Sequence, residues 1–416
     1  MQAMTQQEAL AHAASIPLDQ IDLSNPDLFQ SDIVWPYLAR LRREDPVHYQ
    51  ANGYQGKFWS ITKFNDIMTV DTNHEVFSSE SSLGGITIAD APTQSRFPMF
   101  IAMDPPKHDD QRRTVSPIVA PMNLAKMSVT IRERACAILD GLPRNETFDW
   151  VDRVSIELTT QMLATLFDFP FEDRRLLTYW SDVATSPIAP DAPPEAWDKR
   201  NGELRKCLEY FTGLWNQRVN APPATDLVSM LAHSPATRNM PPMEFLGNLI
   251  LLIVGGNDTT RNSISGGLMF LNQFPAEYQK LRDNPKLIPS MVSEIIRYQT
   301  PLSHMRRTAI QDFELRGKQI KKGDKVVMWY ISGNRDEEVI ENPDQFIIDR
   351  ARPRQHLSFG FGIHRCVGNR LAEMQLQILW EEALKRFPKI EVVGNVERMR
   401  SSFVHGITAL PVCIPG

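Results

Sequence analysis

The stretch SFGFGIHRCVGNRLAE, residues 358–373, sets a lone cysteine, Cys366, among three glycines. Glycine lets a backbone turn through positive φ and lie flat against a bulky group. After the cysteine, apolar residues recur at positions 367, 371, 374 and 378, the spacing of a helix that buries one face. The pattern predicts that Cys366 lies at or just before a helix N-terminus, where free N–H groups and the helix dipole favour an anionic thiolate.

A thiolate held in this way is a metal ligand or a nucleophile. A nucleophilic cysteine needs a base, and His364 stands two residues away. A zinc site needs further Cys or His at short spacing, which this stretch lacks. A haem iron with one axial thiolate needs a single cysteine in a glycine-rich loop with an aromatic residue beside the sulfur, and Phe359 suits that place. A buried cysteine without a role is the usual alternative, but the surrounding pattern argues against it.

The run FGFGIHRCVG resembles the haem-binding loop of cytochromes P450, in the bacterial form with His two residues before the cysteine. Further matches extend from about residue 30 to the C-terminus. The resemblance implies a mainly α fold with a small β region, the cytochrome P450 fold, in which a triangular helical prism surrounds a buried haem b. It implies that Cys366 binds the iron and that Phe359 and Gly360 shape the loop around it.

Length and composition limit the class of protein. With 416 residues, of which 42% are hydrophobic, the chain can bury a large core, and its net charge of -5 gives no sign of nucleic-acid affinity. Four scattered cysteines favour a reducing compartment. The chain start does not resemble a signal peptide, and the longest apolar window is too short to span a membrane. We expect a cytoplasmic protein with a polar segment at 1–30, mobile at its start, and a single domain at 31–416.

Local patterns predict a helix at 32–44 with Ser31 as its N-cap, and strands near 47–50 and 57–62. The stretch 78–103 is rich in Gly, Ser, Thr and Pro, and loops of this length are usually functional or disordered. In cytochromes P450 the corresponding loop covers the substrate pocket. The resemblance therefore assigns to the pocket the residues Ile86, Ile88, Met99 and Phe100.

Prolines in the stretch 186–197 rule out a continuous helix there. Composition alone suggests a domain linker, whereas the resemblance implies a link between two helices that form a lid over the active site.

His108 and Arg112 are four residues apart in a helical segment that follows two prolines, so they share one face. Spacing alone suggests a solvated polar surface. The resemblance implies that the pair holds a haem propionate, a role that suits the forked donors of arginine. It adds Arg307 and His364 as two further propionate donors.

The segment 243–272 is apolar almost all round, which predicts a long buried helix. Its middle, GGNDTT at 255–260, contradicts helix propensity and buries polar groups. Thr259 can donate back to the carbonyl of Gly255, and the glycines leave room beside the helix. A close helix crossing is the alternative. The motif resembles the oxygen-activation motif of cytochromes P450, which implies that Thr259 contacts dioxygen and water, Asp258 delivers protons and Gly255 borders the substrate.

Glu294 and Arg297 are an i, i+3 pair, which by itself is usually a surface salt bridge. The resemblance implies a buried structural pair that ties its helix to the loop before the cysteine, with Arg350 as candidate third partner. The resemblance also assigns apolar residues to the substrate pocket, although such residues are ordinarily core. These are Leu302, Met305, Phe403 and Val404.

The resemblance implies a monooxygenase that inserts one oxygen atom from O2 into an unactivated C–H bond of a small apolar substrate. Electrons would come from a separate ferredoxin and an NAD(P)H-dependent ferredoxin reductase, with Arg365 and Arg370 in the docking face. Several segments look like the bacterial family that hydroxylates the terminal carbon of medium-chain alkanes and fatty acids. The alternatives are a steroid side-chain terminal hydroxylase, a haem sensor or carrier without turnover, and a cysteine hydrolase using Cys366 and His364.

Overall fold

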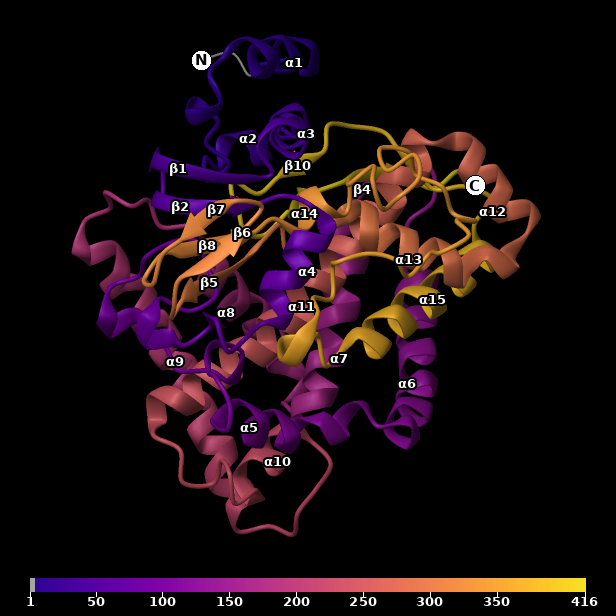
Figure 1. Ribbon diagram of the computed structural model, residues 1–416. Helices are drawn as coiled ribbons and strands as arrows, with labels where there is room; N and C mark the ends of the chain where they lie inside the picture. The colour runs from indigo at the N-terminus through magenta and orange to yellow at the C-terminus, as the bar shows by residue number, and fades with distance from the viewer. Residues whose placement is uncertain (1–3) are drawn as a thin grey trace.

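The computed structural model describes residues 4–416, which form a mainly helical protein with small sheets, as the sequence predicts (Figure 1). The helices are α1 (Gln6–Ser15), α2 (Asp27–Gln30), α3 (Trp35–Glu44), α4 (Phe64–Thr72), α5 (Lys107–Val115), α6 (Pro121–Asp140), α7 (Glu157–Phe167), α8 (Arg175–Thr185), α9 (Pro194–Val219), α10 (Leu227–His233), α11 (Pro242–Gln273), α12 (Pro275–Asp283), α13 (Ile288–Gln299), α14 (Tyr330–Gly333) and α15 (Asn369–Arg386). None of the helices within residues 4–416 is long and apolar enough to cross a bilayer.

The strands are short and form several small sheets. They are β1 (Val47–Gly53), β2 (Gly56–Ile61), β3 (Phe77–Ser78), β4 (Thr147–Asp149), β5 (Met305–Ala309), β6 (Phe313–Leu315), β7 (Lys318–Ile320), β8 (Lys325–Met328), β9 (Glu391–Val392), β10 (Glu397–Arg398), β11 (Ile407–Ala409) and β12 (Pro411–Cys413). The largest sheet has the order β1-β2-β8-β5-β3, in which only β2 and β8 run parallel. The two predicted strands are β1 and β2, and both are confirmed.

The N-terminal segment packs on the rest of the protein instead of preceding it as a polar extension. In α1 the side chain of Thr5 accepts from the backbone of Glu8, whose carboxylate accepts in return from the backbone N–H of Thr5. Behind this cap, Ala9 and Ala13 are buried, and the ring of Phe29 stacks on Trp329 at 6.0 Å. Residues 4–30 therefore share a hydrophobic core with later elements. The start that we expected to be mobile includes residues 1–3, which lie outside the described residues.

The first predicted helix begins later than its sequence pattern suggests. Asp32 has a φ of 55°, a left-handed conformation that interrupts the helix expected at 32–44. Ser31 is consequently the C-cap of α2 and not an N-cap, and α3 starts at Trp35 with a proline in its first turn.

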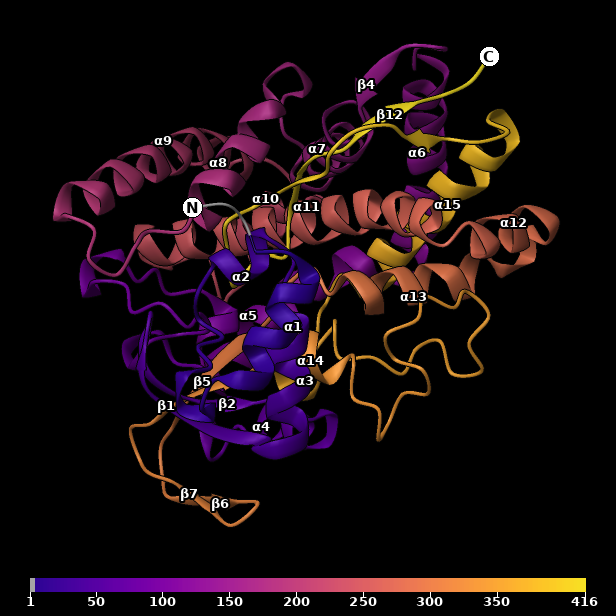
Figure 2. The same ribbon diagram turned by 90° about the horizontal axis from the view of Figure 1, so that it is seen from above.

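Helix α11 crosses the protein and contacts most of the other long helices, as both ribbon views show (Figures 1 and 2). Its 32 residues match the predicted buried helix at 243–272. Two of its glycines allow close packing: a Cβ on Gly247 would lie 2.0 Å from the carbonyl oxygen of Pro98, and one on Gly267 would lie 2.7 Å from Ile295 of α13. The helix is thus held between the loop before α5 and α13.

The two irregular stretches that the sequence singles out flank this helix. Residues 79–103 contain only short 3-10 turns, including Thr93–Ser95 and Phe100–Ala102. The proline-rich stretch connects α8, which ends at Thr185, to α9, which starts at Pro194. It is therefore a link between two helices that pack on each other, as the resemblance implies, and not a domain linker.

Candidate active site

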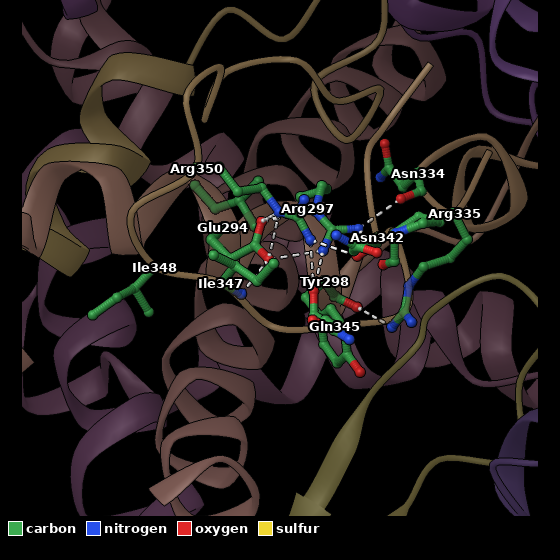
Figure 3. A network of polar contacts seen from close by, with 12 residues as sticks. Glu294, Arg297, Tyr298, Asn334, Arg335, Asn342, Gln345, Ile347, Ile348 and Arg350 are labelled. Carbon is green, nitrogen blue, oxygen red and sulfur yellow. Dashed lines mark hydrogen bonds and ion pairs between the residues drawn. The ribbon is translucent and has the colours of Figure 1, made fainter. Parts of the chain in front are cut away.

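The pair Glu294 and Arg297 on α13 is buried and anchors the scaffold of the site (Figure 3). Arg297 donates to both carboxylate oxygens at 2.8 Å, and its remaining donors reach three backbone carbonyls, among them that of Asn334 at 2.7 Å. Arg350 donates its Nε to both oxygens of Glu294 at 2.9 Å, and the backbone N–H of Ile347 donates at 2.8 Å. Arg350 is thus the third partner that the sequence left as a candidate.

Asn334 connects the Glu294–Arg297 pair to the cysteine loop. Its side-chain amide donates to Ser358 Oγ at 2.9 Å and accepts from the backbone N–H of Leu357 at 2.6 Å. Ser358 in turn donates to the carbonyl of Ile296 on α13 at 2.8 Å. The start of the loop is therefore fixed to α13 by side-chain hydrogen bonds, and the motif alone gives no sign of Asn334.

The cysteine loop needs glycine at two positions. Gly360 and Gly362 both have a φ of 65°, and a Cβ on Gly362 would lie 2.6 Å from the carbonyl oxygen of Asp71. Gly368 is different, because its φ is -90° and a Cβ there would meet open space. The backbone N–H of Cys366 donates to the carbonyl of Phe359 at 2.8 Å, which closes the loop.

Cys366 lies two residues before Gly368, the N-cap of α15, as the sequence predicts. Burial raises the pKa of its thiol, while the backbone N–H groups of Gly368 and Asn369 and the guanidinium groups of Arg112 and Arg365 oppose that rise. The lowered pKa expected from the helix N-terminus is therefore outweighed by the low polarity of the surroundings, although Cys366 is itself exposed to a cavity between this loop and α11. A bound metal ion would overcome the raised pKa of the thiol, because a thiol that coordinates a metal is deprotonated outright.

The four predicted propionate donors gather beside this loop. The rings of His108 and His364 meet edge to face with centroids 4.4 Å apart, and Ser79 Oγ lies 2.8 Å from His364 Nε2. Arg112 donates to the carbonyl of Arg365, the residue before the cysteine. Burial lowers the pKa of His364, and the nearby positive charges of Arg307, His108 and Arg112 lower it further.

Arg307 is held in place by a buried carboxylate that sequence reasoning missed. Its Nη2 donates to Asp71 Oδ1 at 2.8 Å, and both side chains are almost fully buried. The other oxygen of Asp71 accepts from the Tyr330 hydroxyl and from the backbone N–H of Phe361, each at 2.8 Å. Asp71 therefore joins β5 to the cysteine loop.

Two buried ring nitrogens test whether this cluster suits a haem. Within residues 4–416, His108 Nε2 and His364 Nδ1 have no hydrogen-bond partner. Buried polar atoms without partners are rare in folded proteins, and here they adjoin two guanidinium groups. His364, Arg112 and Arg307 border the cavity and can donate to carboxylates such as the two haem propionates, so the residues present fit the group.

Across from the loop, Thr259 Oγ1 donates to the carbonyl of Gly255 at 3.0 Å, as its spacing predicts. A Cβ on Gly255 would meet open space, whereas one on Gly256 would lie 2.7 Å from Leu163 of α7. The two glycines therefore differ: Gly255 leaves room beside the helix, and Gly256 allows a close helix crossing.

Asp258 does not border the cavity and is fully buried. Its Oδ1 accepts from Arg261 at 2.7 Å and from Asn257 at 3.2 Å, while Oδ2 has no partner in the described part of the chain. Arg261 also donates at 2.9 Å to Asp182 of α8, whose side chain is 47% exposed. Burial raises the pKa of Asp258 against the attraction of Arg261. Charged groups thus lead from the surface at Asp182 to the buried acid.

This cavity lies between the cysteine loop and α11 and is bordered by residues of both. The predicted residues that border it are Cys366, Phe359, Gly360, His364, Arg112, Arg307, Thr259, Gly255, Ile86, Met99, Phe100, Leu302, Met305 and Phe403. Ile88 and Val404 do not border it, because Ile88 packs into the core near Trp329 and Val404 is fully buried. The prediction of these two as pocket residues differs from the structure. Asp258 and His108 are buried and do not border the cavity.

Comparison with known proteins agrees with this geometry. The family model "Cytochrome P450" matches residues 161–402, which include α11, the Glu294–Arg297 pair and Cys366. The chain belongs to the cytochrome P450 family. Cytochromes P450 carry haem b and act as monooxygenases with dioxygen and an organic substrate, so these properties hold for this chain.

Individual cytochromes P450 match over nearly the whole chain. The solved structure of CYP153D17 from Sphingomonas sp. PAMC 26605 is 51% identical, with a TM-score of 0.91 over 96% of this chain and 100% of that one. Linalool 8-monooxygenase of Pseudomonas putida is 36% identical over 95% of this chain and 99% of its own length. A methyl-branched lipid omega-hydroxylase of Mycobacterium tuberculosis is 31% identical over 95% of both.

Sequence reasoning missed four polar residues around the site. Asp71, Ser79 and Asn334 are far in sequence from the residues they hold, so no local pattern reveals them. Arg261 is different, because its i, i+3 spacing from Asp258 on a helix was available as a signal.

Proposed function

We propose that this cytochrome P450 hydroxylates the terminal carbon of medium-chain alkanes or fatty acids, with Cys366 as the iron ligand. The observation that carries the proposal is the apolar wall of the cavity between the cysteine loop and α11, to which Phe100, Leu302 and Phe403 contribute. Terminal attack works against C–H bond strengths, so it requires an apolar funnel that admits only the end of a chain.

A thiolate-bound haem supplies oxygen activation, since electron donation by the thiolate favours O–O cleavage. The chain's own residues supply the protons and the geometry. Thr259 Oγ1 borders the cavity and holds a hydrogen bond to the Gly255 carbonyl that it can exchange for one to a water. Asp258 precedes it in sequence, and burial raises the pKa of its carboxyl, which favours the protonated form that a proton donor needs.

Two findings support an apolar chain as the substrate. CYP153D17 is about half identical to this chain over almost its full length, and segments of this sequence resemble the terminal alkane and fatty-acid hydroxylases. The mycobacterial relative is, by its name, an omega-hydroxylase of methyl-branched lipids. Both relationships favour attack at a chain end over attack at a ring.

The electron donor in this proposal is a separate ferredoxin, reduced by an NAD(P)H-dependent reductase. Arg365 and Arg370 are exposed on either side of Cys366 in the sequence, and neither forms an ion pair within residues 4–416. Exposed arginines beside the cysteine favour an acidic partner through charge complementarity.

The test is to supply the reduced system with octane, a medium-chain fatty acid and a sterol in parallel. The proposal predicts terminal alcohol from octane or the fatty acid, identified by mass spectrometry against authentic standards. Product from the sterol alone would instead assign the protein to the steroid side-chain hydroxylases and overturn the proposal.

A further inference from the structure

Two arginines interrupt the apolar wall of the cavity at its end remote from Cys366. Arg96 follows the 3-10 turn Thr93–Ser95, and Arg200 lies in the second turn of α9; both border the cavity. Both ribbon views place α9 well apart from α15, at whose start the cysteine lies (Figures 1 and 2). Around the two arginines the wall is small and apolar, with Ala89 and Ala184 among its residues.

Arg200 forms no ion pair with an Asp or Glu side chain within residues 4–416. Its Nη2 donates to the carbonyl of Ala184 at 2.5 Å, and its guanidinium lies 5.5 Å from the ring of Trp197. Its Nε is buried and has no partner within residues 4–416. Burial lowers the pKa of Arg200 to about 10, so the side chain remains charged at neutral pH. Arg200 is partly buried, and removing a charge from water without a counter-ion is costly unless something else pairs with it.

Arg96 is likewise bonded only to neutral groups among the described residues. Its Nε donates to the carbonyl of Ala91 at 2.7 Å, and Nη1 reaches that of Ser82 at 3.4 Å. Its neighbour Arg306 differs, because it is neutralised by Asp90 at 2.5 Å. Burial lowers the pKa of Arg306, and the nearby charge of Arg96 lowers it further.

A buried hydrogen bond holds the two arginines near each other. Asn201 donates its side-chain amide to Ser95 Oγ at 2.9 Å, and both residues are less than 8% exposed. Asn201 follows Arg200 and Ser95 precedes Arg96, so this bond fixes α9 to the turn that carries the other cation. The two segments that carry the cavity-lining arginines are therefore fixed to each other.

We infer that Arg96 and Arg200 bind the carboxylate of a fatty acid whose hydrocarbon chain lies along the cavity toward Cys366. A carboxylate matches the forked donors of arginine and would neutralise charges that the protein leaves without an acid. Holding the head at this end leaves the opposite end of the chain for reaction, which is the terminal selectivity of the proposed function on which this inference rests. An alkane offers nothing to this pair of cations.

The experiment compares laurate with methyl laurate, which has the same chain without the charge. Each is titrated into the holoenzyme at neutral pH and followed by the shift of the haem absorbance, with thermal stabilisation as a second readout. We expect laurate to bind about tenfold more tightly, and Arg200→Gln to remove most of that preference without weakening the ester. Arg96→Gln should act in the same direction with a smaller effect.

Two variants serve as controls. Lys199→Gln removes an exposed charge next to Arg200 that does not border the cavity, and it should leave both affinities unchanged. Arg200→Lys keeps the charge and should retain part of the preference for laurate, even if the glutamine variant folds poorly. Equal affinities for acid and ester in the wild type, or equal losses of both in Arg200→Gln and Arg96→Gln, would overturn the inference.

The two proposals fail separately. If terminal alcohols form but neither arginine variant alters the preference for the acid, only the carboxylate anchor is wrong. If laurate binds through the arginines but no terminal alcohol forms from any chain, the anchor stands and the proposed regiochemistry is wrong.

Discussion

Two buried acid–arginine pairs of this protein share one spacing and differ in their surroundings. Glu294 and Arg297 on α13, and Asp258 and Arg261 on α11, are both i, i+3 pairs with fully buried carboxylates. Both oxygens of Glu294 accept hydrogen bonds from arginine, and a backbone N–H adds another. Asp258 has one paired oxygen, and its Oδ2 has no partner within residues 4–416.

The difference separates a structural pair from the pair that we propose to be reactive. A carboxylate whose lone pairs are all occupied has no place for a further proton or water, and it fixes the elements that it joins. A buried carboxylate with a free oxygen and a raised pKa can take up and release a proton. Spacing alone therefore does not assign a role to such a pair; the partners of each oxygen do.

The largest expected effect is from breaking the structural pair. Arg297→Ala removes one of the two arginines that bind the buried Glu294 carboxylate, together with a donor to three backbone carbonyls, and should lower the free energy of unfolding by about 3 to 5 kcal/mol. We expect little haem-loaded protein, measured by urea unfolding and by haem content per chain. The exposed Arg352→Ala is the control. A stable, haem-loaded Arg297→Ala protein would remove the distinction between the two pairs.

The next effect concerns the reactive pair. Asp258→Asn keeps the shape of the side chain but cannot release a proton, so product formation should fall on the order of a hundredfold while substrate affinity is unchanged. The haem spectrum and the unfolding midpoint should stay close to wild type. Product formation at the wild-type rate would show that Asp258 is as structural as Glu294.

A smaller effect is expected from the hydroxyl in front of that acid. Thr259→Ala removes the cavity-facing oxygen, so NADH consumption should continue while the yield of hydroxylated product per NADH falls several-fold. The measurement is product and NADH in the same reaction, with Thr212→Ala, on the exposed face of α9, as control. Unchanged coupling would favour a haem protein that binds ligands without turnover.

The smallest effect is on stability against pH. Burial raises the pKa of Asp258 above its ordinary value of 3.8. Between the pKa of Asp258 in the unfolded chain and its raised pKa in the folded protein, the folded protein keeps a proton that the unfolded chain releases. The contribution of Asp258 to stability therefore falls as pH rises through that window. Urea unfolding at pH values from about 4 upward should show this fall in wild type and not in Asp258→Asn. Parallel curves for the two proteins would contradict the raised pKa.

Local patterns predicted the parts of this protein in which neighbours in sequence are also neighbours in space. The apolar run of α11 and the glycines at 360 and 362 are such cases, because helix burial and positive φ depend on a few adjacent residues. The start of α3 was predicted wrongly, since the left-handed Asp32 has no clear local signal. The roles of Asp71 and Asn334, and the places of Arg96 and Arg200 in the cavity wall, depend on contacts across the fold, which one sequence does not contain.

The central claim is that the Cys366 thiolate binds a haem iron on the side of the cavity opposite Thr259. The most direct measurement is the carbon monoxide difference spectrum of the reduced protein, recorded for wild type and for Cys366→Ser. The account predicts the long-wavelength band of thiolate-bound haem in wild type and its loss in the serine variant. A colourless wild-type protein despite ample haem supply, or the same band with serine in place, would contradict it.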